Sequence, residues 1–515
     1  MTEPRVINPW LIAVSVMFAT FMEVLDTTVV NVSLPHIAGS LSASIDEATW
    51  ALTSYLVANA IILPMTGWLA SMFGRKRLLM LSVVGFTAAS FLCGLAPTLS
   101  TLILFRILQG ATGGALQPLS QAVLLEAFAP KDRGKAMGFW ALGIVVAPIL
   151  GPVLGGWLTD NYSWRWVFYI NIPVGIASIV MTKLYIFDPP YLRTESRKVD
   201  YWGMGMLAVG IGALQIVLDK GQQEDWFESS FITMLAIVSA VTLVALVVHE
   251  LTTDDPIVDL RVFKARSYAV GVFLMTIVGF VLYGSMVLLP VMLQTLLGYP
   301  PLQAGIAMAP RGIGSFFMMP LTGLMTGRFD PRKLLTAGLL VGGTALLWLS
   351  QLNLQAGYWD IFWPQLIQGV GMSLLFVPLT TVSMDPIPRE RMGNATSLFN
   401  LMRNIGGSIG IAATGTMLAR NNQSTTALLG ANVTPYDPAS QAMLAQMKGA
   451  FMAAGADPVT ATDRAHAAVF GLVQRQATMM SFVGIFQLLG IMFIVLIPLV
   501  LLMRRPKAGG HVAAH

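Results

Sequence analysis

The sequence predicts an all-α membrane protein with about fourteen transmembrane helices, arranged as two six-helix bundles with two additional helices between them. Hydrophobic residues make up 55% of the 515 residues, and charged residues make up only 11%. A soluble globular chain carries about 25% charged residues. Each bilayer span requires about 20 apolar residues, and the chain contains such stretches along most of its length. The second half of the chain also repeats motifs of the first half, which indicates two related bundles.

The predicted spans follow one another with mostly short polar connections. The first predicted span follows a short polar N-terminal segment, and further spans come directly after it. We therefore interpret it as a retained helix instead of a cleaved signal peptide. The spans cover residues 11–35, 49–72, 78–97, 101–125, 135–158, 167–187, 201–218, 231–250, 268–292, 303–326, 333–351, 360–383, 393–418 and 478–503.

Lys and Arg residues gather in alternate loops, whereas the intervening short loops contain mainly Arg165 and Lys220. Basic loops mark the cytoplasmic side of a membrane protein, so we expect both termini in the cytoplasm and an even number of spans. These topology signals account for the net charge of +5 and argue against a nucleic-acid partner. The basic loops contain residues 75–77, 131–135, 193–198, 261–266, 328–333, 389–391 and 504–507.

Motifs of the first half recur about 256 to 259 residues later in the chain. The segment GWLASMFGRKRLL (67–79) returns as GLMTGRFDPRKLL (323–335), and KDRGKAMG (131–138) is echoed by RERMGNAT (389–396). The corresponding basic loops are expected on the same side of the membrane in both copies. The two halves are therefore parallel repeats related by an axis along the membrane normal.

This repeat divides the chain into three parts. We expect an N-terminal six-helix bundle over residues 1–200, two linking helices within 201–265, and a C-terminal six-helix bundle over 266–515. The C-terminal part includes a long segment at 419–477 on the non-cytoplasmic side. Its Gln, Asn, Thr and Pro content suggests a loop with short helices.

Two carboxylates, Glu23 and Asp26, lie inside the first apolar span. A charge at that depth costs roughly 2.5–3.5 kcal/mol on insertion scales and marks a functional candidate. Their spacing of three places them on one helix face, with Asn31 further along the helix. An isolated carboxylate in an apolar medium holds a proton more readily than one in water, so both are candidate proton carriers that titrate as a coupled pair. The alternative is a structural salt bridge between one carboxylate and an arginine.

Arg106 lies in the middle of the fourth span, whereas its counterpart in the second half is the neutral Gln365. The first bundle alone therefore pairs its carboxylates with a permanent cation at this level. An arginine keeps its proton and can tune a nearby carboxylate. A fixed structural bridge is the alternative interpretation.

Scattered polar side chains within the spans predict a cavity between the bundles, because binding sites combine apolar walls with a few polar groups. Phe18, Phe21, Trp140, Phe280 and Phe399 are candidates for apolar contact, although packing is the simpler role for each. Arg311 and Arg403 are candidates for attracting anionic groups or for holding helix contacts, and Arg403, near a helix end, has snorkelling to the membrane surface as a simpler alternative. The polar cavity candidates are Asn31, Tyr55, Asn59, Gln109, Gln117, Tyr283, Arg311 and Asn400.

The fifth span reads GIVVAPILGPVLGG over residues 143–156. Small residues let helix backbones approach in a membrane, and proline permits bending. Generic packing would also explain such a run. Its glycines and prolines are Gly143, Pro148, Gly151, Pro152, Gly155 and Gly156.

Together with the loop at 67–77, these features resemble the major facilitator superfamily and, within it, the fourteen-span drug:proton antiporters. The fifth span is similar to the signature of the exporters. Gly67, Gly74, Arg75, Lys76 and Arg77 match the family's cytoplasmic gate loop. In the family an Asp usually occupies the position that Ser71 has in this chain, and that Asp would pair with basic residues in the gate. Without it, the resemblance does not predict the gate's salt bridge here. Five further stretches carry the resemblance: VLDTTVVNVSLP (24–35), WRWVFYINIPVG (164–175), LDKGQQEDWF (218–227), MAPRGIG (308–314) and MRNIGGSIG (402–410).

The resemblance implies the major facilitator fold and a proton-coupled antiporter that exports hydrophobic or cationic drugs across the bacterial inner membrane. Asp26 matches the family's proton site, with Arg106 in proton coupling and Glu23 one helix turn away. The implied partners are a periplasmic adaptor, docked on residues 419–477, and an outer-membrane channel.

A proton gradient is the implied driving force, without a cofactor. The sequence contains no P-loop and no HExxH helix, which argues against ATP drive, a zinc site and an enzyme. Its single cysteine, Cys93, excludes an intrachain disulfide. Two alternatives remain: a dedicated exporter of one metabolite, such as a siderophore or antibiotic, and a membrane sensor or scaffold that transports nothing.

Overall fold

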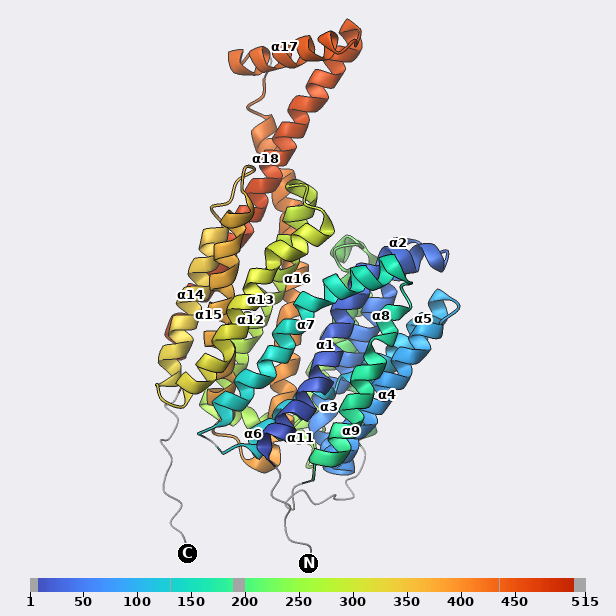
Figure 1. The fold of residues 1–515 in the computed structure, drawn as a ribbon, viewed down its shortest axis with the longest axis vertical. Helices are drawn as coiled ribbons and strands as arrows, with labels where there is room; N and C mark the ends of the chain where they lie inside the picture. The colour runs from blue at the N-terminus through green and yellow to red at the C-terminus, as the bar shows by residue number, and fades with distance from the viewer. Residues whose placement is uncertain (1–7, 130, 189–199, 435, 504–515) are drawn as a thin grey trace, which may run out of the picture.

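The computed structural model describes residues 8–129, 131–188, 200–434 and 436–503, without the side chains of Ile149, Pro152, Pro301 and Leu302. Over these residues the chain forms helices and no β-strand. Two groups of helices stand side by side, and a helical arm projects beyond them at one end (Figure 1). The predicted basic clusters at 193–198 and 504–507 lie outside the described residues.

The first group of helices covers the six predicted N-terminal spans. The fourth span is divided at Gly114 into α5 and α6, and the sixth span starts with the short α8. The helices are α1 (Pro9–Ser40), α2 (Ile45–Ala48), α3 (Trp50–Phe73), α4 (Arg75–Leu95), α5 (Leu99–Gly113), α6 (Leu116–Ala127), α7 (Arg133–Asn161), α8 (Trp166–Tyr169) and α9 (Asn171–Tyr185).

The two linking helices and the second group follow in chain order. A π-helical turn, Met292–Leu296, extends α12, and short 3₁₀ turns lie at Trp226–Glu228, Leu260–Lys264 and Arg389–Arg391. The helices are α10 (Tyr201–Lys220), α11 (Ser230–Thr252), α12 (Arg266–Val291), α13 (Pro301–Thr326), α14 (Pro331–Leu349), α15 (Tyr358–Met384), α16 (Met392–Gly430), α17 (Pro438–Ala453), α18 (Pro458–Val495) and α19 (Ile497–Val500).

Each predicted span falls on described helices, the fourth and sixth, for example, on two consecutive helices each, and the all-α membrane fold is confirmed. Eleven described helical segments are apolar enough to cross a bilayer, or twelve when α7, bent by 41°, is taken as one span. The helices α13 and α16 are outside this set; each is interrupted by an arginine, Arg311 or Arg403. The count of fourteen and the boundaries between the three parts remain predictions.

The chain ends define one side of the molecule, which we call the terminal side. The described ends, Asn8 and Met503, lie at this side, and the opposite side carries the arm (Figure 1). The turns at Gly74 and 385–391 lie at the terminal side, whereas the α4–α5 turn lies at the arm side. Successive turns thus alternate between the two sides, and the basic turns lie on the same side as the chain ends, as the charge pattern predicted.

The arm is more regular than the sequence suggested. Residues 419–477 form the end of α16, all of α17 and the start of α18, in place of a loop with short helices. At about 1.5 Å per residue, the 39 residues of α16 extend about 58 Å, well beyond a hydrocarbon core of about 30 Å.

Two aspartates begin the arm helices. Asp437 accepts hydrogen bonds from the backbone N–H groups of Ala439 and Ser440, and Asp457 caps α18 in the same manner. Hydrogen bonds from the side-chain hydroxyls of Ser440 and Thr460, followed by those backbone donors, hold the pKa of both carboxyls below the usual value. The prolines after these aspartates occupy the first helical position, where proline is favoured, so here they start helices instead of marking a loop.

The two groups of helices contact each other closely on the terminal side, in a region that we call the seam. A Cβ atom on Gly138 of α7 would lie 2.6 Å from the carbonyl oxygen of Met319 on α13. The rings of Trp140 and Phe376 stack with centroids 6.4 Å apart. Thr396 of α16 donates a hydrogen bond of 3.1 Å to the carbonyl of Pro118.

Towards the arm side the two groups diverge (Figure 1). Asn31 of α1 and Val153 and Trp157 of α7 are exposed there. The structure therefore represents a conformation that is closed at the terminal side.

Candidate functional site

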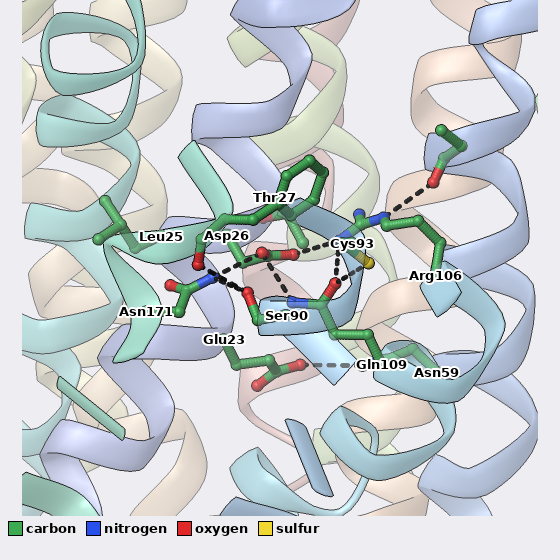
Figure 2. Close-up of polar contacts among 12 residues, drawn as sticks. Glu23, Leu25, Asp26, Thr27, Asn59, Ser90, Cys93, Arg106, Gln109 and Asn171 are labelled. Atoms are coloured by element: carbon green, nitrogen blue, oxygen red, sulfur yellow. Dashed lines mark hydrogen bonds and ion pairs between the residues drawn. The ribbon is translucent and has the colours of Figure 1, made fainter. Parts of the chain in front are cut away.

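The structure joins Asp26 and Arg106 in a fully buried ion pair (Figure 2). A guanidinium nitrogen of Arg106 lies 2.5 Å from one carboxylate oxygen of Asp26. The other carboxylate oxygen accepts hydrogen bonds from the side-chain amides of Gln109, at 2.9 Å, and Asn171, at 2.8 Å. Both oxygens of Asp26 thus have partners in this conformation.

Neighbouring groups hold the pair in place. The Arg106 Nε donates to the backbone carbonyl of Ala51 at 2.9 Å, and its guanidinium lies 4.1 Å from the centroid of the Tyr55 ring. Ser90 accepts a hydrogen bond from Asn171 at 3.0 Å and donates to the carbonyl of Phe168. Because a buried charge is tolerated only when it is paired and hydrogen-bonded, this set of partners explains how the two charges fit between apolar helices.

Asp26 therefore does form a salt bridge to an arginine, as the alternative interpretation predicted. This salt bridge does not exclude proton coupling, because protonation would remove the negative charge that binds Arg106. Removing one member of a buried pair is costly, of the order of 3–5 kcal/mol. Protonation of Asp26 would accordingly weaken the side-chain contact that links α1 to α5 at this site.

Glu23 lies in a different environment, one turn from Asp26 towards the terminal side (Figure 2). Its side chain is 5% exposed, and one carboxylate oxygen accepts a hydrogen bond of 3.0 Å from Asn59. The other oxygen is buried without a hydrogen-bond partner among the described residues. The two carboxylates thus differ: Asp26 is fully paired, and Glu23 is only partly satisfied.

The second bundle contributes a cation beside Glu23. Arg403 of α16 is 3% exposed and donates a short hydrogen bond to Gln117 of α6. Gln117 also neighbours Glu23, and the positive charge of Arg403 acts on that carboxylate without a direct ion pair between the two side chains in the described structure. Arg403 thus makes a helix contact, one of the roles predicted for it, and the alternative of snorkelling to the membrane surface is wrong, because the contact with the first bundle buries it.

Other predicted cavity residues fall on both sides of the seam. Asn400 donates hydrogen bonds to Gln121 of α6 at 2.6 Å and to the backbone of Thr396. Tyr283 is half-buried and packs beside Gly407 within the second bundle. The half-buried Arg311 has one guanidinium nitrogen, Nη2, that is buried without a partner in the described part of the chain.

The predicted site residues therefore fall into two groups, and several of them lie outside both. The structure brings Asp26, Arg106, Gln109 and Tyr55 together, and it brings Glu23 together with Asn59 and Gln117. Asn31, Tyr283 and Arg311 lie outside these two groups, and Asn31 is exposed on the arm side. The cavity-lining role of the whole set remains a prediction.

The glycines of the fifth span allow α7 to pack closely on α1. A Cβ atom on Gly143 would lie 3.0 Å from Met17, and one on Gly151 would overlap Thr28. Gly155 packs on Val29 in the same way, whereas Gly156 faces open space. The bend of α7 lies between Pro148 and Val153, and the side chain of Pro152 lies outside the described residues. The proposed role of this run in antiport is not tested by these contacts.

The gate loop is fastened within the first bundle. Arg75 forms a buried ion pair with Glu126, and the backbone N–H of Lys76 donates to Asp188 at 2.9 Å. Gly74 has a φ of +80°, a conformation that favours glycine. Ser71, in the position of the family's usual Asp, donates to the carbonyl of Trp68.

Gly67 makes the loop's closest approach to the second bundle. A Cβ atom there would lie 2.6 Å from the backbone nitrogen of Asn394. Lys76 lies over the ring of Phe187, and Arg77 is exposed.

Sequence reasoning did not select Asn171, Ser90 and Gln121 for the site. Asn171 lies in the motif WRWVFYINIPVG and is a polar residue in an apolar span, a signal that was available. Ser90 and Gln121 carry no such signal, because serine and glutamine occur at several positions in the spans. Only the packing of α4 and α6 shows that they meet polar partners.

A family model described as Major Facilitator Superfamily matches residues 16–411. The chain belongs to the major facilitator superfamily. It is therefore a membrane transporter and not an enzyme.

Within the superfamily, the chain is similar to proteins named for multidrug export. It is 38% identical to the multidrug export protein EmrB of Escherichia coli K12 over 98% of each chain. It is 41% identical to the EmrB of Haemophilus influenzae, over 85% of this chain and 86% of that protein. The fatty acid resistance protein FarB of Neisseria gonorrhoeae is 39% identical over 97% of each chain.

Solved structures confirm the superfamily fold. The human organic anion transporter MFSD10 (TETRAN) has a TM-score of 0.59 at 12% identity, covering 95% of this chain and all of that one. The proton:xylose symporter XylE has the same TM-score at 17% identity, covering 81% and 90%. At these identities the likeness concerns the major facilitator fold alone.

Proposed function

We propose that this major facilitator protein is a proton-coupled antiporter that exports hydrophobic and cationic drugs across the bacterial inner membrane. The similarity to multidrug export proteins over nearly the whole chain supports multidrug efflux. The buried Asp26–Arg106 pair supports proton coupling, because it places a protonatable group and a permanent cation in one apolar layer.

Coupling would proceed through the charge of Asp26. With the terminal side in the cytoplasm, the observed closed seam corresponds to an outward-open state, from which protons reach the first bundle. A proton on Asp26 cancels its charge and weakens its hold on Arg106. The bundles would then rock about the midplane, as parallel repeats in this superfamily fold can do. Release of the proton to the cytoplasm would restore the pair.

Glu23 would face the substrate more directly than Asp26 does. Its carboxylate has an oxygen without a hydrogen-bond partner in the described structure and lies beside the seam. Separation of the bundles at the terminal side would expose it to the cytoplasm and the inner leaflet. A cationic drug would be attracted to it, and aromatic and methionine side chains would provide adaptable apolar contacts.

We expect the Asp26→Asn variant to lose export driven by a pH gradient. Asparagine keeps an oxygen for Arg106 but cannot cycle between charged and neutral forms. Proteoliposomes with an imposed pH gradient would report transport of ethidium and of chemically unrelated dyes, together with proton flux. Abundance and monodispersity of the variant serve as the folding control. Drug export equal to that of the unchanged protein would rule out the role of Asp26.

The same dye panel separates the alternative functions. Mutual competition between unrelated dyes supports a multidrug exporter, whereas transport restricted to one chemical type supports a dedicated exporter. Absence of any proton or dye flux from folded protein would favour a sensor or scaffold.

We further propose that the arm docks a periplasmic adaptor (EmrA-like), which connects the pump to an outer-membrane channel (TolC-like). The arm projects from the side opposite the termini (Figure 1). It presents exposed apolar side chains, including Tyr436, Met443, Met452 and Phe470. Such side chains are enriched at protein interfaces.

Replacing residues 424–474 by a short Gly-Ser turn is expected to abolish co-purification of a co-expressed adaptor. The truncated helices remain adjacent, because Thr478 of α18 donates to Asn422 of α16 at 2.9 Å. Dye transport in proteoliposomes should persist and serves as the control for folding. An adaptor that still co-purifies with the truncated protein would contradict docking on the arm.

A further inference from the structure

Arg403 brings a positive charge from the second bundle into the polar cluster of the first. It belongs to α16, yet its hydrogen bond crosses the seam to Gln117 of α6. Its Nε atom is buried without a hydrogen-bond partner in the described structure. The guanidinium has one cross-bundle contact, a contact of 3.4 Å to the neighbouring Asn404, and the ring of Phe376 with its centroid 6.0 Å away.

The negative charge on which this guanidinium acts is the carboxylate of Glu23, and Gln117 is a neighbour of both side chains. The charged and titratable groups around Glu23 are Asp26, Tyr55 and Arg403. Asp26 is already neutralised by Arg106 within the first bundle. Among the described residues, the positive charge that acts on Glu23 comes from Arg403 across the seam, beside the hydrogen bond that Asn59 of the first bundle donates.

This compensation depends on the conformation of the transporter. Glu23 and Gln117 move with the first bundle, whereas Arg403 moves with the second. When the seam opens, the guanidinium withdraws, and the carboxylate then faces the cytoplasm and the inner leaflet without a counter-charge beside it. At the edge of the apolar interior, such a charge favours a new partner, either a proton or a cation.

We propose that Arg403 is a built-in counter-ion of Glu23, and that a monovalent lipophilic cation takes its place when the seam opens. The pair thereby determines the preference for cationic over neutral cargo. This inference rests on the proposed export function for its biological meaning. Its test is a binding measurement without a proton gradient, so it can fail while export is confirmed, and the reverse also holds.

The test compares a charged and a neutral probe of similar shape. Tetraphenylphosphonium and triphenylphosphine oxide would be titrated against the purified full-length protein at fixed pH and salt concentration. In the Arg403→Gln variant the internal competitor is gone, so the affinity for tetraphenylphosphonium should rise about tenfold, as expected for loss of one partly screened charge. The affinity for the neutral probe should change less than twofold, on the order of ordinary scatter.

A double-mutant cycle identifies Glu23 as the group involved. In a Glu23→Gln background, the Arg403→Gln change should no longer raise the affinity for tetraphenylphosphonium. Arg403→Lys keeps the charge and should resemble the unchanged protein. Gln117→Ala removes the cross-bundle hydrogen bond but no charge, so it should affect both probes to a similar extent.

Several outcomes would overturn the proposal. These are an equal gain for the neutral probe, a gain that persists in the Glu23→Gln background, and undetectable binding of tetraphenylphosphonium to folded Arg403→Gln protein. If Arg403→Gln does not fold, Glu23→Gln in the otherwise unchanged chain decides: it should lose tetraphenylphosphonium affinity selectively, and unchanged affinity would refute the inference.

Discussion

Replacing Arg106 by alanine is expected to destabilise the folded transporter by about 3–5 kcal/mol and to abolish export. The substitution would leave the carboxylate of Asp26, which is fully buried, without its counter-charge. It would also remove the guanidinium hydrogen bonds to Gln109 and Ala51 and the contact with the Tyr55 ring. The loss would appear as a lower midpoint of thermal unfolding in detergent, followed by tryptophan fluorescence.

The double variant Asp26→Asn/Arg106→Gln is the matched control. It removes both charges and leaves neither side chain as an isolated ion, so most of the lost stability should return. Transport should not return, because no group in this layer can then exchange a proton. A double variant as unstable as Arg106→Ala would show that the ion pair does not set the stability. A fully coupled double variant would remove both residues from the mechanism.

Replacing Gly138 by valine is expected to prevent closure of the seam and to block transport. A Cβ atom at Gly138 would lie 2.6 Å from the Met319 carbonyl, closer than carbon and oxygen atoms pack in protein interiors. The obstacle is backbone, so no side-chain rotation relieves it. The variant should accumulate in the conformation that is open at the terminal side.

Labelling of one engineered cysteine would measure this shift. Thr396 is fully buried at the seam in the closed state, so a Thr396→Cys reporter should be protected from maleimide in the parent protein and labelled in the Gly138→Val variant. The native Cys93 is also buried and adds little background.

Gly305→Val is the matched substitution for this experiment. Gly305 lies on α13, and a Cβ atom there would meet nothing within 4 Å. Labelling of the reporter should therefore stay low in this control. Protection of the reporter in Gly138→Val as strong as in the parent would show that the close approach at Met319 does not govern closure.

Composition and periodicity predicted the helices well, because a span must satisfy its own backbone hydrogen bonds in lipid. Each predicted span falls on a helix, and the superfamily inferred from the motifs at 67–77 and 143–156 is confirmed. The arm was misinterpreted: its prolines follow the capping residues Asp437 and Asp457 and begin helices. This mistake was avoidable, since an Asp-Pro step before a helical segment is a start signal.

The candidate site was predicted less completely. Glu23, Asp26 and Arg106 stand out in the sequence because charges in apolar spans are rare. Gln109 and Arg403 were also selected from the sequence, but which polar side chain meets which carboxylate was not predicted, because the relative positions of Asn171, Gln109 and Arg403 are determined only by packing. The sequence left open whether Asp26 was isolated or bridged, and the geometry shows the bridge.

The amino-acid sequence by itself determined the membrane setting, the order of the helices, the duplicated halves and the presence of charges in the first span. These properties depend on local hydrophobicity and on residues close in the chain. The tertiary structure alone decided that Asp26 is paired with Arg106 and that Arg403 of the second bundle is buried against Gln117 of the first. These contacts arise because side chains 80 and 286 residues apart in the chain meet only when helices pack.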